Sequence, residues 1–154
     1  MPWQTPERKT EQALKLYMET ILGYELDGVQ IVTRFSNAEL TEPRIEIVAE
    51  RCTPYPEDAQ YYTGSWMVSG EIRVISHYEK SVDAEAHDNI LGNILDNLLI
   101  LDENGNDAAA TQINATQNES NFTVQLVNLG ERTNEVNDHS LVSVQGFEML
   151  INVS

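Results

Sequence analysis

The hydrophobic and polar positions form their clearest pattern between Ser81 and Leu101, in the stretch SVDAEAHDNILGNILDNLLIL. Residues suited to a buried face recur there at steps of three and four: His87, Ile90, Leu91, Ile94, Leu95, Leu98 and Leu101. The positions between them are polar in the same rhythm, which is typical of an amphipathic helix packed on a core. Ser81 suits the N-cap, and the polar DENGND sequence predicts the end of the helix near Leu101.

A second helix is predicted at the start of the chain, from Pro6 to about Leu22. Thr5 suits its N-cap, Pro6 its first turn and Gly23 the position after its end. Its buried stripe consists of Ala13, Leu14, Tyr17, Met18 and Ile21.

Alternation of apolar and polar residues predicts five strands, at Val29–Phe35, Arg44–Cys52, Gly64–Tyr78, Phe122–Leu126 and Leu141–Val153. Gly70 interrupts the third strand and indicates a bulge or a close backbone approach. Residues 102–120 are rich in Asp, Asn, Ala and Gln, so we expect a flexible or extended loop with one short strand near Thr111. The polar sequence GERTNEVNDHS predicts a turn before the last strand.

The elements follow the order α-β-β-β-α-β-β within one domain, residues 1–154. We therefore expect an α+β fold of two layers, with a mainly antiparallel sheet and both helices packed on one face. A chain of this length can bury roughly two-thirds of its unfolded surface. We expect six aliphatic residues from the apolar faces of the second helix and the third strand to be buried together: Ile72, Val74, Ile90, Leu91, Ile94 and Leu98.

The charge of the chain argues against one class of partner, although solubility or adaptation to salt would also account for it. Nine Lys and Arg stand against 25 Asp and Glu, for a net charge of −16, and Arg132 is the only basic residue after Lys80. Such a surface repels phosphate, which argues against specific binding of nucleic acid. No apolar run is long enough to cross a bilayer, and MPWQTPERKT has no signal-peptide core, so we expect no membrane contact. The single Cys52 excludes an intrachain disulfide.

A search for catalytic and metal-binding patterns gives no match. The phosphate-loop, dinucleotide, zinc-protease and serine-hydrolase motifs do not occur, and His77, His87 and His139 are dispersed. Asp102, Asn104 and Asn106 fit a calcium loop, but Asp107 and Ile113 occupy its two most diagnostic positions. We expect no enzyme activity, no cofactor and no metal, and we expect His87 to face the core.

The segment TPYPEDAQYYTG, residues 53–64, is too long for an ordinary turn and contains Tyr55, Tyr61 and Tyr62. Tyrosine is enriched at interfaces because its ring is apolar and its hydroxyl can hydrogen-bond. These three residues are our candidates for a contact between subunits. The alternative, that they fold back over the edge of their own sheet, stays open.

The arrangement resembles a known family. An N-terminal amphipathic helix leads into strands, and a Pro/Tyr loop precedes a long strand. A second helix follows, and the chain ends with the strand in VNDHSLVSVQGFEMLINV. This order of elements resembles that of the tail terminator or tail-completion proteins of tailed bacteriophages. The resemblance implies a structural protein of the virion, made in the host cytoplasm, that forms a hexameric ring at the head-proximal end of the tail. Its partners would be other copies, the tail tube protein and the head-proximal connector. The long stretch 102–120 departs from the pattern.

A ring on a DNA-delivering tail should let DNA pass without holding it. Such a conduit is expected to present carboxylates and few cations to its lumen. The candidates are Glu85, Asp88 and Asp96 on the second helix, or Asp102 in the loop 102–107, and the sequence does not choose between them.

Three other functions remain open. The chain could be another neck protein, a stopper or an adaptor. It could be a small-ligand binding module, for which a deep pocket lined by Trp66, Tyr78 and Phe147 would be the sign. It could be a hydrolase, for which two carboxylates with perturbed pKa in one cleft would be the sign.

Overall fold

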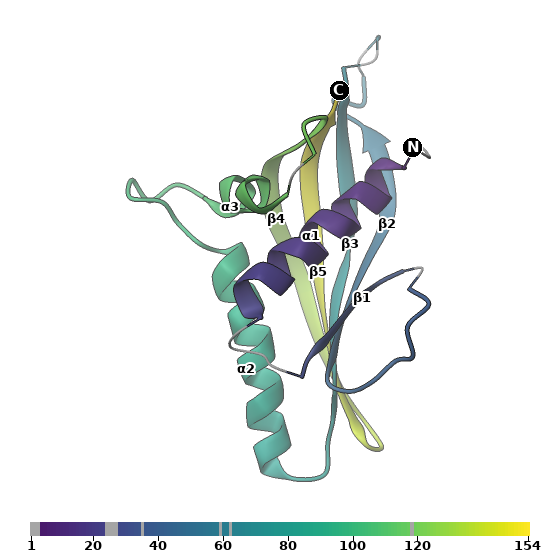
Figure 1. The fold of residues 1–154 in the computed structure, drawn as a ribbon, viewed down its shortest axis with the longest axis vertical. Coiled ribbons are helices and arrows are strands. Elements are labelled where there is room, and N and C mark those ends of the chain that lie inside the picture. The colour runs from purple at the N-terminus through teal and green to yellow at the C-terminus, as the bar shows by residue number, and fades with distance from the viewer. Residues whose placement is uncertain (1–3, 24–27, 35, 59, 62, 118) are drawn as a thin grey trace.

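The computed structural model places three helices on one face of a five-stranded sheet (Figure 1), which confirms the α+β fold class. It describes residues 4–23, 28–34, 36–58, 60–61, 63–117 and 119–154. The elements are α1 (Pro6–Leu22), β1 (Gln30–Thr33), β2 (Arg44–Pro54), β3 (Ser65–His77), α2 (Ser81–Leu98), α3 (Ala109–Thr116), β4 (Phe122–Asn137) and β5 (Ser140–Val153).

The sheet has the strand order β1-β2-β3-β5-β4. Only the short β1–β2 pair is parallel among these strands, and the other pairs are antiparallel. A β-bulge follows Ala49 in β2, opposite Gly70 of β3. A Cβ at Gly70 would overlap the carbonyl oxygen of Val48 and come within 2.7 Å of the Ala49 Cα, which confirms the close backbone approach expected there.

Helix α1 begins and ends where the sequence predicts. The Oγ1 atom of Thr5 accepts a hydrogen bond from the Arg8 N–H at 3.2 Å, so the N-cap is as expected. The helix crosses the sheet diagonally (Figure 1) and buries Leu14 and Tyr17, each only 1% exposed. The Tyr17 hydroxyl donates to the Asn97 carbonyl oxygen at 2.8 Å, which ties α1 to α2.

Helix α2 differs from its prediction at both ends. Lys80, not Ser81, occupies the N-cap position, and the Asp83 carboxylate accepts the N–H groups of Glu79 and Lys80, each at 2.9 Å. Those two backbone donors hold the pKa of Asp83 below its usual value. The helix ends at Leu98, because Leu101 turns away to form a β-bridge with Asp107.

Two segments expected to be irregular are regular. Residues 109–116 form α3, so the short strand expected near Thr111 is wrong, and α3 inserts Ala109 and Ile113 into the core. Strand β4 does not end near Leu126 but continues to Asn137, so the predicted polar turn shrinks to Asp138 and His139.

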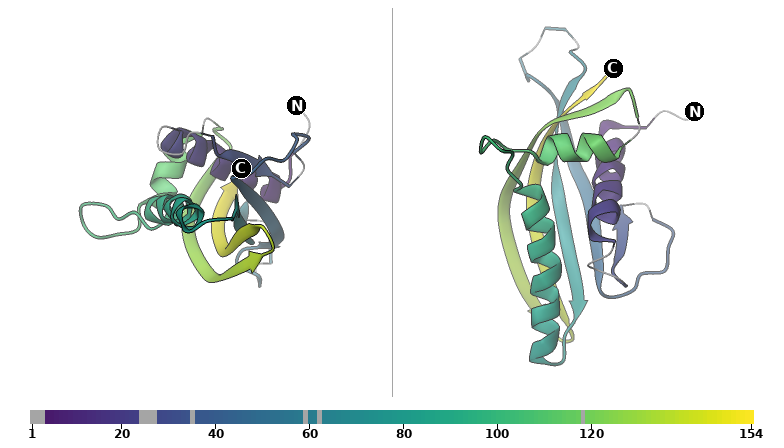
Figure 2. Two further views of the ribbon diagram at one scale, coloured as in Figure 1. Left: turned by 90° about the horizontal axis from the view of Figure 1, so that it is seen from below. Right: turned by 60° about the vertical axis from the view of Figure 1, so that its left-hand side comes forward.

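Figure 2 shows the helices on one side of the sheet, and the core residues come from the facing sides of both layers. The six aliphatic residues expected to be buried together all belong to it: Ile72, Val74, Ile90, Leu91, Ile94 and Leu98. No described helix covers the opposite side of the sheet. We call that side the open face, and Glu46, Arg73 and Val144 lie on it.

Candidate functional site

The four acidic residues proposed for a lumen are all exposed. Glu85, Asp88 and Asp96 lie on the solvent side of α2, and Asp102 begins the connection to α3. That connection, residues 99–107, projects from the body of the molecule (Figures 1 and 2), and we call it the arm. No Lys or Arg occurs between residues 81 and 131, and we call the exposed carboxylates of α2 and the arm the acidic strip.

Asp102 also organises the arm. One of its carboxylate oxygens, Oδ1, accepts the N–H groups of Asn104 at 2.8 Å and Asn106 at 2.9 Å, and its own N–H donates to the Asn106 carbonyl oxygen. These contacts form a local turn of the kind that Asp side chains favour. The resemblance to a calcium loop therefore reflects turn chemistry, and the described residues contain no cluster of three or more metal-ligating side chains.

The tyrosine loop, residues 55–63, joins β2 to β3 at the end of the sheet near the C-terminus (Figure 1). Tyr55 is 43% exposed and Tyr61 is 79% exposed, whereas Tyr62 lies outside the described residues. The base of the loop is fixed by Tyr55 N–H donating to Ser65 O and by Thr63 Oγ1 donating to Tyr55 O. The structure does not bring Tyr55 and Tyr61 together with Glu85 and Asp88, which lie in the first half of α2, at its end far from the tyrosine loop.

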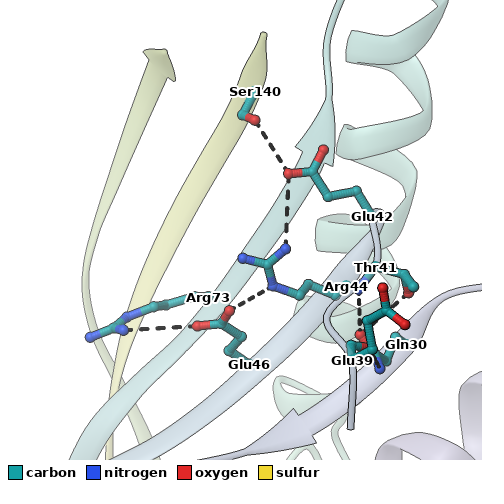
Figure 3. Close-up of polar contacts among 8 residues, drawn as sticks. All are labelled: Gln30, Glu39, Thr41, Glu42, Arg44, Glu46, Arg73 and Ser140. Carbon is teal, nitrogen blue, oxygen red and sulfur yellow. Dashed lines mark hydrogen bonds and ion pairs between the residues drawn. The ribbon is translucent and has the colours of Figure 1, made fainter. Parts of the chain in front are cut away.

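A chain of ion pairs crosses the open face, as Figure 3 shows. The Arg44 guanidinium contacts Glu46 at 2.6 Å and Glu42 at 3.9 Å. Arg73 contacts Glu71 at 2.9 Å and two further carboxylates, those of Glu50 and Glu46, at 3.6 and 3.9 Å. The sequence signal was the alternation of charged residues along β2, but only the strand register, which places Glu46 opposite Arg73, brings the two strands' charges together.

Two open depressions flank these ion pairs. One, of about 490 Å³, is lined by Thr33, Arg34, Ser36, Ala38, Leu40, Glu46, Val48, Glu50 and Arg73. The other, of about 440 Å³, is lined by Glu50, Arg51, Ser69, Gly70, Glu71, Glu131, Thr133, Val144 and Gly146. The first is bounded by the β1–β2 loop, which Gln30 fastens by accepting the Thr41 N–H at 2.9 Å and donating to the Glu39 carbonyl oxygen at 2.9 Å (Figure 3).

A polar chain of three buried residues and the exposed Asn134 lies on the helix-covered side of the sheet. Ser143 Oγ donates to Asn134 Oδ1 at 2.7 Å, so it accepts from His87 Nε2–H at 2.8 Å. His87 Nδ1 is then the acceptor for the Ser76 hydroxyl at 2.7 Å, and the imidazole is neutral. We call these four residues the His87 network. His87, Ser76 and Ser143 are at most 5% exposed, which makes neither serine accessible to a substrate.

Burial lowers the pKa of His87, and the nearby Asp88 opposes that shift. His87 thus faces the core, as expected from the sequence. Since a protonated ring could not accept from Ser76, the network itself favours the neutral form.

Two further titratable groups are the buried Glu11 and the half-buried Cys52. Burial raises the pKa of Glu11, although its carboxylate accepts the Ala49 N–H at 2.8 Å beside the β-bulge, and Arg8 and Arg34 favour its charge. Burial and the neighbouring Glu7 raise the pKa of the Cys52 thiol to about 12, so this cysteine is not an activated nucleophile.

In the part of the chain that it describes, the structure shows neither the pocket expected for a small-ligand binding module nor the carboxylate pair expected for a hydrolase. Trp66 and Tyr78 are twelve positions apart on and just beyond β3, a separation of roughly 40 Å for extended chain, and Phe147 is a core residue, so the three do not line one pocket. Glu11 and Asp83, two carboxyl groups with shifted pKa, lie on different helices and do not share a cleft.

The sequence matches no protein-family model, and no curated protein shows significant similarity to it. None of the described helices is both long and apolar enough to cross a membrane.

Proposed function

We propose that this chain is a structural virion protein, a tail terminator-like subunit that closes into a homo-oligomeric ring, most simply a hexamer, between the tail tube and the head-proximal connector. The observation that carries the proposal is the acidic strip. It runs along the exposed side of α2 through Glu85, Asp88 and Asp96 and continues into the arm at Asp102 without an intervening cation.

The strip supports the proposal through symmetry. A helix of 18 residues is about 27 Å long, so each copy would present carboxylates along much of that length. A closed ring repeats those carboxylates at every subunit, and the negative potentials add around the axis. DNA could then pass without being held.

The tyrosine loop supports subunit contacts. Tyr55 and Tyr61 are more exposed than large aromatic side chains usually are, and they lie on a loop that protrudes from the sheet. We assign the contact between neighbouring subunits to this loop, together with Tyr62, and the tail tube and connector proteins to the two faces of the ring.

Light scattering after size exclusion, followed by electron microscopy of the assembled protein alone and with a tail tube protein, tests the ring. A six-fold particle with α2 toward its axis is expected. A chain that stays monomeric with both candidate neighbours, or a ring with a basic lumen, would overturn the proposal.

Charge reversal tests the lumen separately. The triple variant Glu85→Lys, Asp88→Lys, Asp96→Lys should make the ring retain duplex DNA at moderate salt. The control Glu19→Lys, Glu39→Lys, Glu119→Lys makes the same change in charge at exposed positions outside α2, the arm and the tyrosine loop, and should not. Equal DNA retention by both variants would show that the strip does not face the conduit.

A further inference from the structure

Strand β4 is the outermost strand of the sheet and is 16 residues long. Among the described residues, those that contact its outer edge cover only the first part of it. The Asn114 side chain of α3 accepts the Val124 N–H at 2.8 Å and donates to the Val124 carbonyl oxygen at 2.7 Å, as a neighbouring strand would. Gln117 donates to the Phe122 carbonyl oxygen at 2.9 Å. From Leu126 to Asn137, no described strand pairs with the outer edge.

The register identifies the backbone groups that this edge presents. In an antiparallel pair, alternate residues direct their N–H and C=O groups toward the partner strand or away from it. Val124 faces outward and pairs with Ile151. Every second residue of β5 from Ile151 belongs to the same set, and their β4 partners are Val127, Leu129, Arg132, Asn134 and Val136. These five residues therefore offer donors and acceptors to solvent.

Unbalanced negative charge lies beside this edge on the open face. The register places Glu135 next to Val142, and Glu148 opposite Ser69; Glu131 lines the depression that Ser69 also lines. Among the described residues, none of these three carboxylates has an ion-pair partner, whereas Glu46 and Glu71 are paired with arginines. Arg132, the one cation of β4, belongs to the opposite face because it pairs with the buried Gln145.

We propose that the edge of β4 from Val127 to Val136 binds an extended segment of a partner protein as an added strand, and that this segment carries Lys or Arg on the side next to the open face. Main-chain hydrogen bonds to the five outward residues would supply affinity, and contacts with Glu131, Glu135 and Glu148 would supply selectivity. A second copy of this chain fits poorly, because each copy has a net charge of −16 and only Arg132 in its own edge strand.

The test uses the full chain and two synthetic peptides long enough to span the edge, one alternating Lys with Val and Thr, the other with Glu at every Lys position. We expect the Lys peptide to bind, more weakly as salt rises, and the Glu peptide not to bind. Hydrogen exchange should slow at the amides of Arg132, Asn134 and Val136 when the Lys peptide is added. Binding without protection of these amides would overturn the added strand.

Variants separate strand addition from general attraction to an acidic protein. Val136→Pro removes one outward N–H while sparing the ladder with β5, and should weaken binding by about tenfold; Val136→Thr keeps the N–H and should bind normally. Glu131→Gln with Glu135→Gln should weaken binding by roughly two- to fivefold per charge, while Glu103→Gln with Asp107→Asn on the arm should not.

Equal weakening by both charge pairs would overturn the selectivity assigned to β4. If the protein associates with itself and Val136→Pro abolishes that association, the edge of β4 would instead bind a second copy of this chain. Binding of the Lys peptide and protection of the β4 amides do not require ring formation, so this inference can fail while the proposed function stands, and the reverse.

Discussion

The two halves of the β4–β5 hairpin have different interiors. The root half, residues 122–129 and 147–153, turns only apolar side chains toward the helices: Phe122, Val124, Val127, Leu129, Phe147, Met149 and Ile151. The distal half, residues 130–146, turns the polar side chains of Asn134, Ser143 and Gln145 to the same side of the sheet. There His87 and Ser76 complete the His87 network, and Gln145 Nε2 donates to the carbonyl oxygens of Gly130 and Gly146.

The difference shows how one hairpin can be held in two ways. Apolar burial in the root half stabilises the fold roughly in proportion to the area removed from water. A hydrogen bond in the distal half adds little net stability, because the unfolded chain bonds to water instead, but breaking one partner leaves a buried polar group unsatisfied. The distal half is therefore fixed in geometry more than it is stabilised.

The largest expected effect is in the root half. Ile151 is fully buried, so Ile151→Ala should lower the free energy of unfolding by roughly 2–5 kcal/mol through lost transfer energy and a cavity. Leu150→Ala is the matched control, since Leu150 is the next residue and lies half-buried on the open face. If urea denaturation shows that Ile151→Ala and Leu150→Ala lower the free energy of unfolding equally, the open face must be covered in solution.

A smaller loss is expected in the distal half. Ser143→Ala removes the acceptor of His87 Nε2–H and the donor to Asn134 Oδ1, and should cost about 1–3 kcal/mol. Ser69→Ala, on the open face, should cost much less. If Ser143→Ala proves neutral, the hydrogen bonds of the network contribute nothing, and the contrast between the halves disappears.

Low pH should weaken the distal half selectively. The folded pKa of His87 lies below its ordinary value of 6.5, so above that value the ring is neutral in both states and its contribution is fully present. As pH falls from about 6.5 toward the folded pKa, the unfolded chain takes up the proton first and stability is lost, by at most about 1.4 kcal/mol per pH unit.

Glu11 must be separated from this effect. Its folded pKa is raised, so the folded state binds the proton first and stability rises as pH falls toward 4.5, the opposite sign. Urea denaturation of the wild type and of His87→Gln across this range isolates the histidine. The difference between the two stabilities should shrink as pH falls; a constant difference would contradict the prediction.

The same contrast explains which parts of the fold could be predicted from the sequence. The root half, α1 and α2 were recognised because their apolar residues recur at a regular period. The distal part of β4 was missed because two of its three inward residues, Arg132 and Asn134, are as polar as its outward ones. Helix α3 was missed because AATQINAT has no side-chain cap and buries only Ala109 and Ile113. The hydrogen bonds from the Asn114 and Gln117 side chains to the edge of β4 form only when the chain folds back, and no hydrophobic period signals them.

Some candidate surfaces could be predicted from local sequence patterns and others could not. Exposure of Glu85, Asp88, Asp96 and Asp102 followed from helical and turn chemistry. The ion pairs of the open face and the unpaired edge of β4 depend on strand order and register, which no local pattern specifies.

The finest test lies within the distal half and requires no substitution. The register directs the N–H groups of Thr133, Glu135 and Asn137 toward β5 and those of Arg132, Asn134 and Val136 toward solvent. Hydrogen exchange measured residue by residue should therefore alternate along this segment, with slow exchange at the first set and fast exchange at the second. Even the slow set should exchange faster than Leu126 and Asn128 of the root half, because opening the distal hairpin exposes little apolar surface. Uniformly slow exchange would mean that the outer edge of β4 is already paired in solution, and uniformly fast exchange would mean that the distal ladder does not form.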